Sequence, residues 1–65
     1  MTLELGKCYE FTLASGKVVR LKFLGGNPLR WQTEECTIIE GPLDKVLGEP
    51  TQSPDPKEIP CWECP

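Results

Sequence analysis

The residues of this chain best suited to chemistry are its four cysteines, Cys8, Cys36, Cys61 and Cys64. The last two have two residues between them, a spacing that can point both sulfurs at one atom, as in a zinc site or a redox dithiol. Structural zinc takes four ligands, and the chain contains no histidine to supply one. One zinc site formed by all four cysteines is therefore a hypothesis, on condition that the C-terminal segment folds back. The alternative is that the protein holds no cofactor and that Cys8 and Cys36 are small packed residues.

The surroundings of the C-terminal cysteine pair do not favour catalysis. Redox pairs of this spacing usually begin a helix, whose dipole makes the thiolate easier to form. Here Pro60 and Pro65 flank the pair, and Glu63 inside it disfavours a thiolate. The chain contains no histidine, and Ser15 lies in a predicted turn without a general base to activate it. We therefore expect a protein that is not an enzyme.

The sequence also gives an expectation for the cellular location of the protein. No stretch approaches the roughly 20 apolar residues of a membrane span, and residues 1–5 lack the basic start and apolar run of a signal peptide. These features predict a cytoplasmic protein without a membrane partner, whose cysteines are reduced thiols or metal ligands. A secreted disulfide scaffold would need a cleaved signal, which this sequence does not show.

Charge is distributed unevenly along the chain. The net charge is −3 and the pI is about 4.8, which disfavours nucleic acid as a partner. Residues 1–30 hold five basic and two acidic side chains, a net of +3, whereas residues 31–65 hold two basic and eight acidic, a net of −6. We expect the strand at 36–40 and the tail to cover the basic hairpin, within one chain or across a dimer.

A small group of basic residues nevertheless forms a candidate binding surface. Arg20, Lys22 and Arg30 are predicted to project from neighbouring strands, with Trp31 next to Arg30 in sequence. Basic side chains interleaved with aromatic ones can hold single-stranded nucleic acid by charge and stacking. The alternative for Trp31 is a place in the core, on the same strand face as Leu29.

Alternating apolar residues predict short strands joined by turns. Residues 8–13 place Tyr9, Phe11 and Leu13 on one face, residues 18–23 alternate in the same way, and a glycine turn at 14–17 between them predicts a β-hairpin. Further strands are expected at 29–33, 36–40 and 45–47, with one helical turn near Pro42. We therefore divide the chain into a small β domain over residues 1–48 and a tail over residues 49–65.

The tail differs from the domain in composition. Residues 49–60 contain four prolines and one aliphatic residue, too little apolar surface to offset the entropy of ordering. We expect it to be disordered and extended like polyproline, with Trp62 as a possible anchor for a partner.

Four or five short strands in about 45 residues predict a small, strongly bent antiparallel sheet. Closing this sheet into a barrel would remove its exposed edges. The chain resembles an SH3-like or Sm-like barrel over residues 5–47. The stretches that carry the resemblance are Gly6-Lys7-Cys8-Tyr9-Glu10-Phe11, Ser15–Gly25, Leu29-Arg30-Trp31, Cys36–Ile39 and Val46-Leu47. The resemblance concerns architecture, and it implies a binding module for RNA, peptides or partner subunits.

The sequence thus favours an all-β, SH3-like binding or adaptor module that contacts a protein partner through its surface and through Trp62. RNA binding through Arg20, Lys22 and Arg30 and a zinc-stabilised structural protein are the alternatives. About 48 residues form a marginal core, so a homo-oligomer is also an open possibility.

Overall fold

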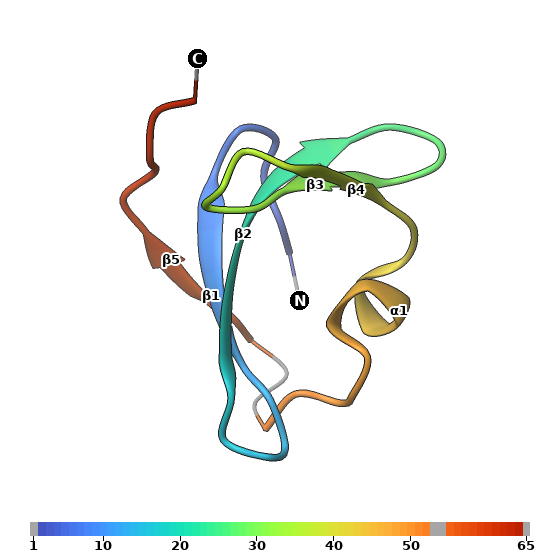
Figure 1. The fold of residues 1–65 in the computed structure, drawn as a ribbon, viewed down its shortest axis with the longest axis vertical. Helices are drawn as coiled ribbons and strands as arrows, with labels where there is room; N and C mark the ends of the chain where they lie inside the picture. The colour runs from blue at the N-terminus through green and yellow to red at the C-terminus, as the bar shows by residue number, and fades with distance from the viewer. Residues whose placement is uncertain (1, 53–54, 65) are drawn as a thin grey trace.

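The computed structural model describes residues 2–52 and 55–64. In this part of the chain the elements are β1 (Cys8–Thr12), β2 (Val18–Gly25), β3 (Arg30–Gln32), β4 (Ile38–Glu40), α1 (Leu43–Leu47) and β5 (Lys57–Ile59), as Figure 1 shows. The strands form one antiparallel sheet in the order β4-β3-β2-β1-β5. The prediction of a small all-β protein with antiparallel strands is confirmed.

The sheet is open, so the predicted closure into a barrel is not observed. Strands β4 and β5 lie at its two edges and do not pair with each other. The long strand β2 is shared: its first part pairs with β1, and from Lys22 onward it pairs with β3. The register shifts between Phe23 and Gly25, a bulge that bends β2.

The hairpin of β1 and β2 forms as the alternating pattern predicts. Tyr9 lies opposite Leu21, and Phe11 lies opposite Val19. In the turn, the Gly16 N–H donates to the Leu13 carbonyl at 2.8 Å, and Gly16 has a φ of 92°, which glycine adopts without steric cost. The predicted core face is confirmed, because Tyr9, Phe11, Leu13 and Leu21 are all buried.

Trp31 lies at the centre of the core and is 1 % exposed. Its ring meets Phe11 edge to face with centroids 6.5 Å apart, and it lies tilted against Phe23 at 5.0 Å. Its indole N–H donates to the Gly41 carbonyl at 2.9 Å, which satisfies the one polar group that it buries. Trp31 therefore joins three strands and the chain after β4.

The segment 45–47, predicted as a final strand, instead belongs to the helix α1. Leu43, Val46 and Leu47 are spaced three and four residues apart, so one turn of helix turns all three toward the core cluster. Gly48 ends the helix in the left-handed conformation, and its N–H donates to the Asp44 carbonyl. The strand prediction was wrong because a five-residue helix is too short to show a clear helical period.

The C-terminal segment is not a disordered tail in the residues described. Lys57–Ile59 pair with Cys8–Glu10 as β5, and Figure 1 shows this strand alongside β1. Earlier in the chain, before β5, Thr51 forms an isolated antiparallel β-bridge with Leu13. The prediction counted only apolar burial, whereas backbone pairing and covalent bonds order this segment. Ser53, Pro54 and Pro65, which the prediction also included, lie outside the described residues.

Candidate functional site: a cross-linked strap and an apolar cavity

The four cysteines form two disulfides, Cys8–Cys61 and Cys36–Cys64, with Cα–Cα distances of 5.2 and 5.6 Å. This overturns the hypothesis of a zinc site, because all four sulfurs are already bonded and no thiolate remains to bind metal. Among the described residues no group of three or more cysteine, aspartate or glutamate side chains could hold a metal ion. The expectation of reduced thiols is wrong as well. Cys61 and Cys64 bond to different partners, so they do not form a redox pair with each other.

The spacing of Cys61 and Cys64 matches the distance that the chain must cross. Cys8 lies on β1, and Cys36 lies in the turn between β3 and β4, two strand positions away. Neighbouring strands are about 4.8 Å apart, and three extended residues span about 10 Å. Residues 57–64, which we call the strap, therefore run along the edge of the sheet and then across it, with a disulfide at each end of the crossing.

The strap explains why Cys8 and Tyr9 are both buried. Consecutive strand residues point to opposite faces, so a sheet covered on one face leaves every second residue exposed. Tyr9 points into the core, whereas Cys8 points to the other face and is still 0 % exposed because it is bonded to the strap. Lys22, directly opposite Cys8 on β2, shares that face and is half-buried.

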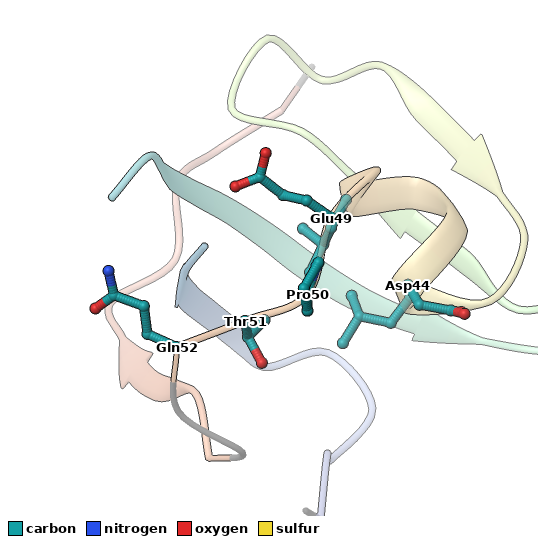
Figure 2. A pocket seen from close by; sticks show the side chains of 7 residues that line it. Asp44, Glu49, Pro50, Thr51 and Gln52 are labelled. Atoms are coloured by element: carbon teal, nitrogen blue, oxygen red, sulfur yellow. The ribbon is translucent and has the colours of Figure 1, made fainter. Parts of the chain in front are cut away.

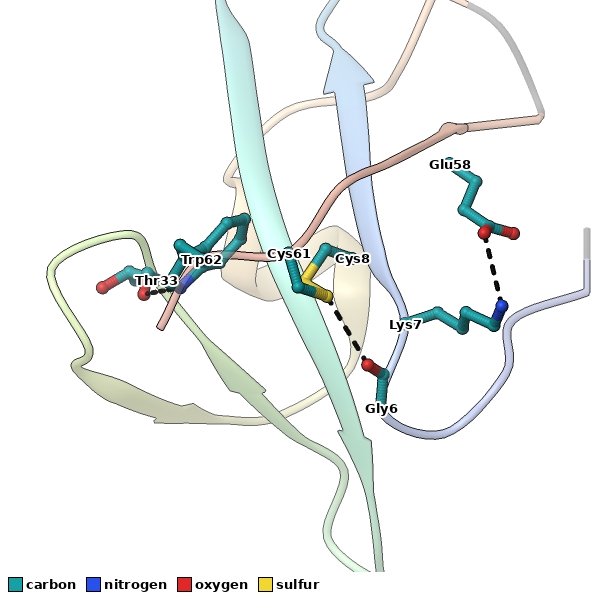
Figure 3. The surroundings of a disulfide bond; sticks show 7 residues. All are labelled: Gly6, Lys7, Cys8, Thr33, Glu58, Cys61 and Trp62. Carbon is teal, nitrogen blue, oxygen red and sulfur yellow. Dashed lines mark hydrogen bonds and ion pairs between the residues drawn. A yellow bond between two sulfur atoms is a disulfide. The ribbon is translucent and has the colours of Figure 1, made fainter. Parts of the chain in front are cut away.

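Trp62 holds the strap at the far side of the sheet. Its indole N–H donates to the Thr33 carbonyl, just beyond β3, at 3.0 Å, and Figure 3 shows the ring lying toward Thr33. On the near side, the Cys61 sulfur lies 3.6 Å from the Gly6 carbonyl oxygen. A disulfide sulfur carries no proton, so this is a contact and not a hydrogen bond. Trp62 is thus engaged within the chain and is only half-exposed.

The predicted basic surface is brought together only in part, and glutamates neutralise much of it. Arg20 pairs with Glu10 at 3.0 Å and with Glu34 at 3.6 Å, while Arg30 pairs with Glu40 at 3.4 Å. The hydrogen bond that Arg20 donates to the Glu10 carboxylate, then the charges of Glu10 and Glu34, raise the pKa of Arg20 above its usual value. Of the three predicted basic residues, only Lys22 has no ion pair with a described residue, and Trp31 is too deeply buried to stack on a base.

A cavity of about 460 Å³ lies between α1 and the segment that follows it, as Figure 2 shows. Its lining is mainly apolar, with polar groups from the chain after the helix. The residues that line it are Leu43, Asp44, Leu47, Glu49, Pro50, Thr51 and Gln52. This cavity was not predicted from the sequence. Its only signal there is the spacing of two apolar residues, Leu43 and Leu47, shortly before Pro50.

The wall of this cavity is fixed to the hairpin. The Ala14 N–H donates to the Pro50 carbonyl, and the Gln52 N–H donates to the Thr12 carbonyl, each at 2.8 Å. The Glu49 carboxylate accepts from the Ser15 backbone N–H at 3.0 Å. The Ser15 hydroxyl and then this N–H lower the pKa of Glu49 from its usual value, so this carboxylate is ionised at neutral pH.

The two carboxylates beside the cavity differ in their partners. Glu49 is tied to Ser15, whereas the carboxylate of Asp44 makes no hydrogen bond or ion pair with a described residue and is exposed. Asp44 is one of the residues that line the cavity, and Figure 2 shows its side chain projecting from α1. The site therefore combines an apolar hollow with an unpaired negative charge.

The chain matches no family, no curated protein and no solved structure. In the described ranges, no helix is long and apolar enough to span a membrane. The fold and site together define the class as a small, open antiparallel β-sheet protein with two disulfides.

Proposed function

We propose that the protein is a non-enzymatic binding module that holds an extended segment of a partner protein in the cavity beside α1. The observation that carries this proposal is the combination of a pre-formed apolar hollow and the unpaired Asp44 carboxylate. An apolar side chain fits the hollow between Leu43, Leu47 and Pro50. A lysine or arginine next to that side chain complements Asp44, and Glu49 adds negative charge nearby.

The strand order is also consistent with the SH3-like resemblance. Four strands follow one another as a meander, and the fifth returns to pair with the first after a helical turn. Small sheets of this kind commonly serve as rigid supports for binding loops. The resemblance supports a binding role without naming the partner.

The disulfides favour an oxidising setting for this activity. Structural disulfides persist in secreted, periplasmic or surface-exposed proteins and are rare in the cytosol. They also compensate for the small core of a 65-residue chain. The cytoplasmic location expected from the sequence therefore loses its support.

Binding of RNA is less favoured than binding of a protein. Arg20 and Arg30 are already paired with glutamates, and the strap lies on the face of Lys22. The net charge of −3 further opposes the approach of a phosphate backbone.

The test is an amide NMR titration of the oxidised protein with two short synthetic peptides. Both carry a central leucine, followed in one by lysine and in the other by glutamate. We expect the lysine peptide to shift the amides of Leu43, Leu47 and Thr51, with weak affinity, since one buried leucine contributes roughly 1.5–3 kcal/mol. The glutamate peptide should bind less well.

A charge reversal provides the control for this experiment. Asp44→Lys should weaken binding of the lysine peptide, whereas Glu4→Lys, an equal charge reversal at another exposed carboxylate, should not. Shifts confined to Arg20, Lys22 and Arg30 on addition of single-stranded RNA, weakening as salt rises, would instead support the nucleic-acid alternative.

A further inference from the structure

No residue of the strap belongs to the hydrophobic core cluster of the described chain. The core cluster consists of Tyr9, Phe11, Leu21 and Trp31, with further apolar residues packed against it. These are Leu3, Val19, Phe23, Leu43, Val46 and Leu47, and none of them lies in residues 57–64. The strap can therefore leave the sheet without opening the core.

The chain immediately before the strap has its own anchor. Pro50 and Gln52 are hydrogen-bonded to Ala14 and Thr12, and Thr51 bridges Leu13. These contacts involve no residue beyond 52. Release of the strap therefore does not have to disturb the cavity beside α1.

Non-covalent contacts hold the strap weakly. Strand β5 has three residues, and Lys57 and Glu58 are exposed. Its one ion pair with a described residue joins Lys7 and Glu58 at 3.4 Å, a contact visible in Figure 3. Both side chains are about half exposed. Such pairs contribute little, and the hydrogen bond from Trp62 to Thr33 is the main remaining polar contact of the crossing. A segment with so little burial has low local stability without its covalent bonds.

We propose that the strap is a redox-controlled latch. In the oxidised protein it occupies the edge of β1 at Cys8–Glu10 and lies on the face of Cys8 and Lys22. When both disulfides are reduced, residues 57–64 leave the sheet while β1 to β4 and α1 stay folded. The latch thus converts β1 from a paired strand into an open edge that can accept another extended segment.

A dithiol reductant supplies the chemistry of opening. One of its thiolates attacks a sulfur of the protein disulfide, forming a mixed disulfide and releasing one cysteine thiolate, which takes up a proton. The second thiolate of the reductant then displaces the other cysteine and closes the reductant's own disulfide. Each protein disulfide takes up two electrons and two protons. Cys61 is exposed, so this end is open to attack, whereas Cys8 is buried.

Amide hydrogen exchange by NMR tests the latch on the full chain, before and after complete reduction with dithiothreitol. We expect the amides of Lys57–Ile59 and the indole N–H of Trp62 to lose their protection in the reduced protein, and their shifts to move to random-coil positions. The amides of Phe11, Leu21 and Trp31 should stay dispersed and slowly exchanging. The variant Cys36→Ala/Cys64→Ala provides an intermediate case, because β5 should stay paired through Cys8–Cys61 while the indole N–H of Trp62 loses its protection.

Two results would overturn the proposal. If Phe11, Leu21 and Trp31 lose protection together with the strap, the disulfides are needed for the whole fold and there is no latch. If Lys57–Ile59 and the indole N–H of Trp62 keep their protection in the reduced protein, the strap holds without its disulfides and reduction does not open it.

Discussion

The indole N–H of Trp62 donates to the backbone carbonyl of Thr33, 29 residues earlier in the chain, at 3.0 Å. This bond lies between the two cysteines of the strap and fixes it where β3 ends. Thr33 is itself part of a tight turn, since its N–H donates to the Thr37 carbonyl and its carbonyl also accepts from the Cys36 N–H. The strap is thus docked on an ordered turn, which also presents Cys36 to Cys64.

Replacing Trp62 by phenylalanine tests this docking. Trp62→Phe keeps an aromatic ring but removes the donor to Thr33, so we expect a loss of about 1 kcal/mol in the free energy of unfolding. Both disulfides should still form, because the cysteine positions do not change. Urea unfolding measures the loss, and mass mapping of peptides under non-reducing conditions checks the pairing. An unchanged free energy would mean that the hydrogen bond contributes nothing to stability.

Removing the disulfides one at a time should separate their contributions. Cys8→Ala/Cys61→Ala and Cys36→Ala/Cys64→Ala each leave no unpaired thiol. The disulfides join residues 53 and 28 positions apart, and loops of such lengths contribute about 3–4 kcal/mol through the unfolded state. We expect the first variant to lose more, because its loop is longer and because Cys8 is fully buried. The opposite order in urea unfolding would contradict this explanation.

The hairpin and the core could be read from the sequence because they depend on local alternation. Tyr9, Phe11 and Leu13 are spaced two residues apart, and burying one face of a strand requires that spacing. The helix α1 could be predicted only in part, as one helical turn near Pro42. Its extension over 45–47 could not, since Leu43, Val46 and Leu47 form a single turn that is oriented by packing against the core. Strand β5 carries no alternating pattern at all and is placed by its pairing with β1.

The cysteines show a different limit of sequence reasoning. From the sequence, a C-terminal segment folded back toward Cys8 and Cys36 is only the condition of a zinc site, and the two disulfides overturn that site. Four cysteines allow three disulfide pairings as well as a single metal site, and spacing alone does not choose among them. The register of the sheet decides, because it sets Cys8 beside β5 and Cys36 at the far end of the crossing.

Trp31 should be far more sensitive to substitution than Trp62. Trp31→Phe removes the donor to the Gly41 carbonyl and leaves a gap against Phe11 and Phe23. We expect a loss of about 2–3 kcal/mol, since an unsatisfied buried group adds to the cost of a cavity. Trp62→Phe is the matched control, with the same chemical change at a half-exposed position. Similar losses in urea unfolding would contradict the assignment of Trp31 to the core.

The Glu49 carboxylate should make stability depend on pH. Ser15 lowers the pKa of Glu49 in the folded protein, so this glutamate contributes stability above its unfolded pKa, roughly pH 4, and that contribution is lost as the pH falls through the lower folded value. Ser15→Ala removes the hydroxyl, the larger cause, and should raise the titration midpoint of Glu49 while leaving the backbone N–H in place. Thr37→Ala, a hydroxyl deletion in another turn, is the control. Side-chain NMR titration gives the midpoints, and identical values in the wild type and Ser15→Ala would show that the hydroxyl does not act on Glu49.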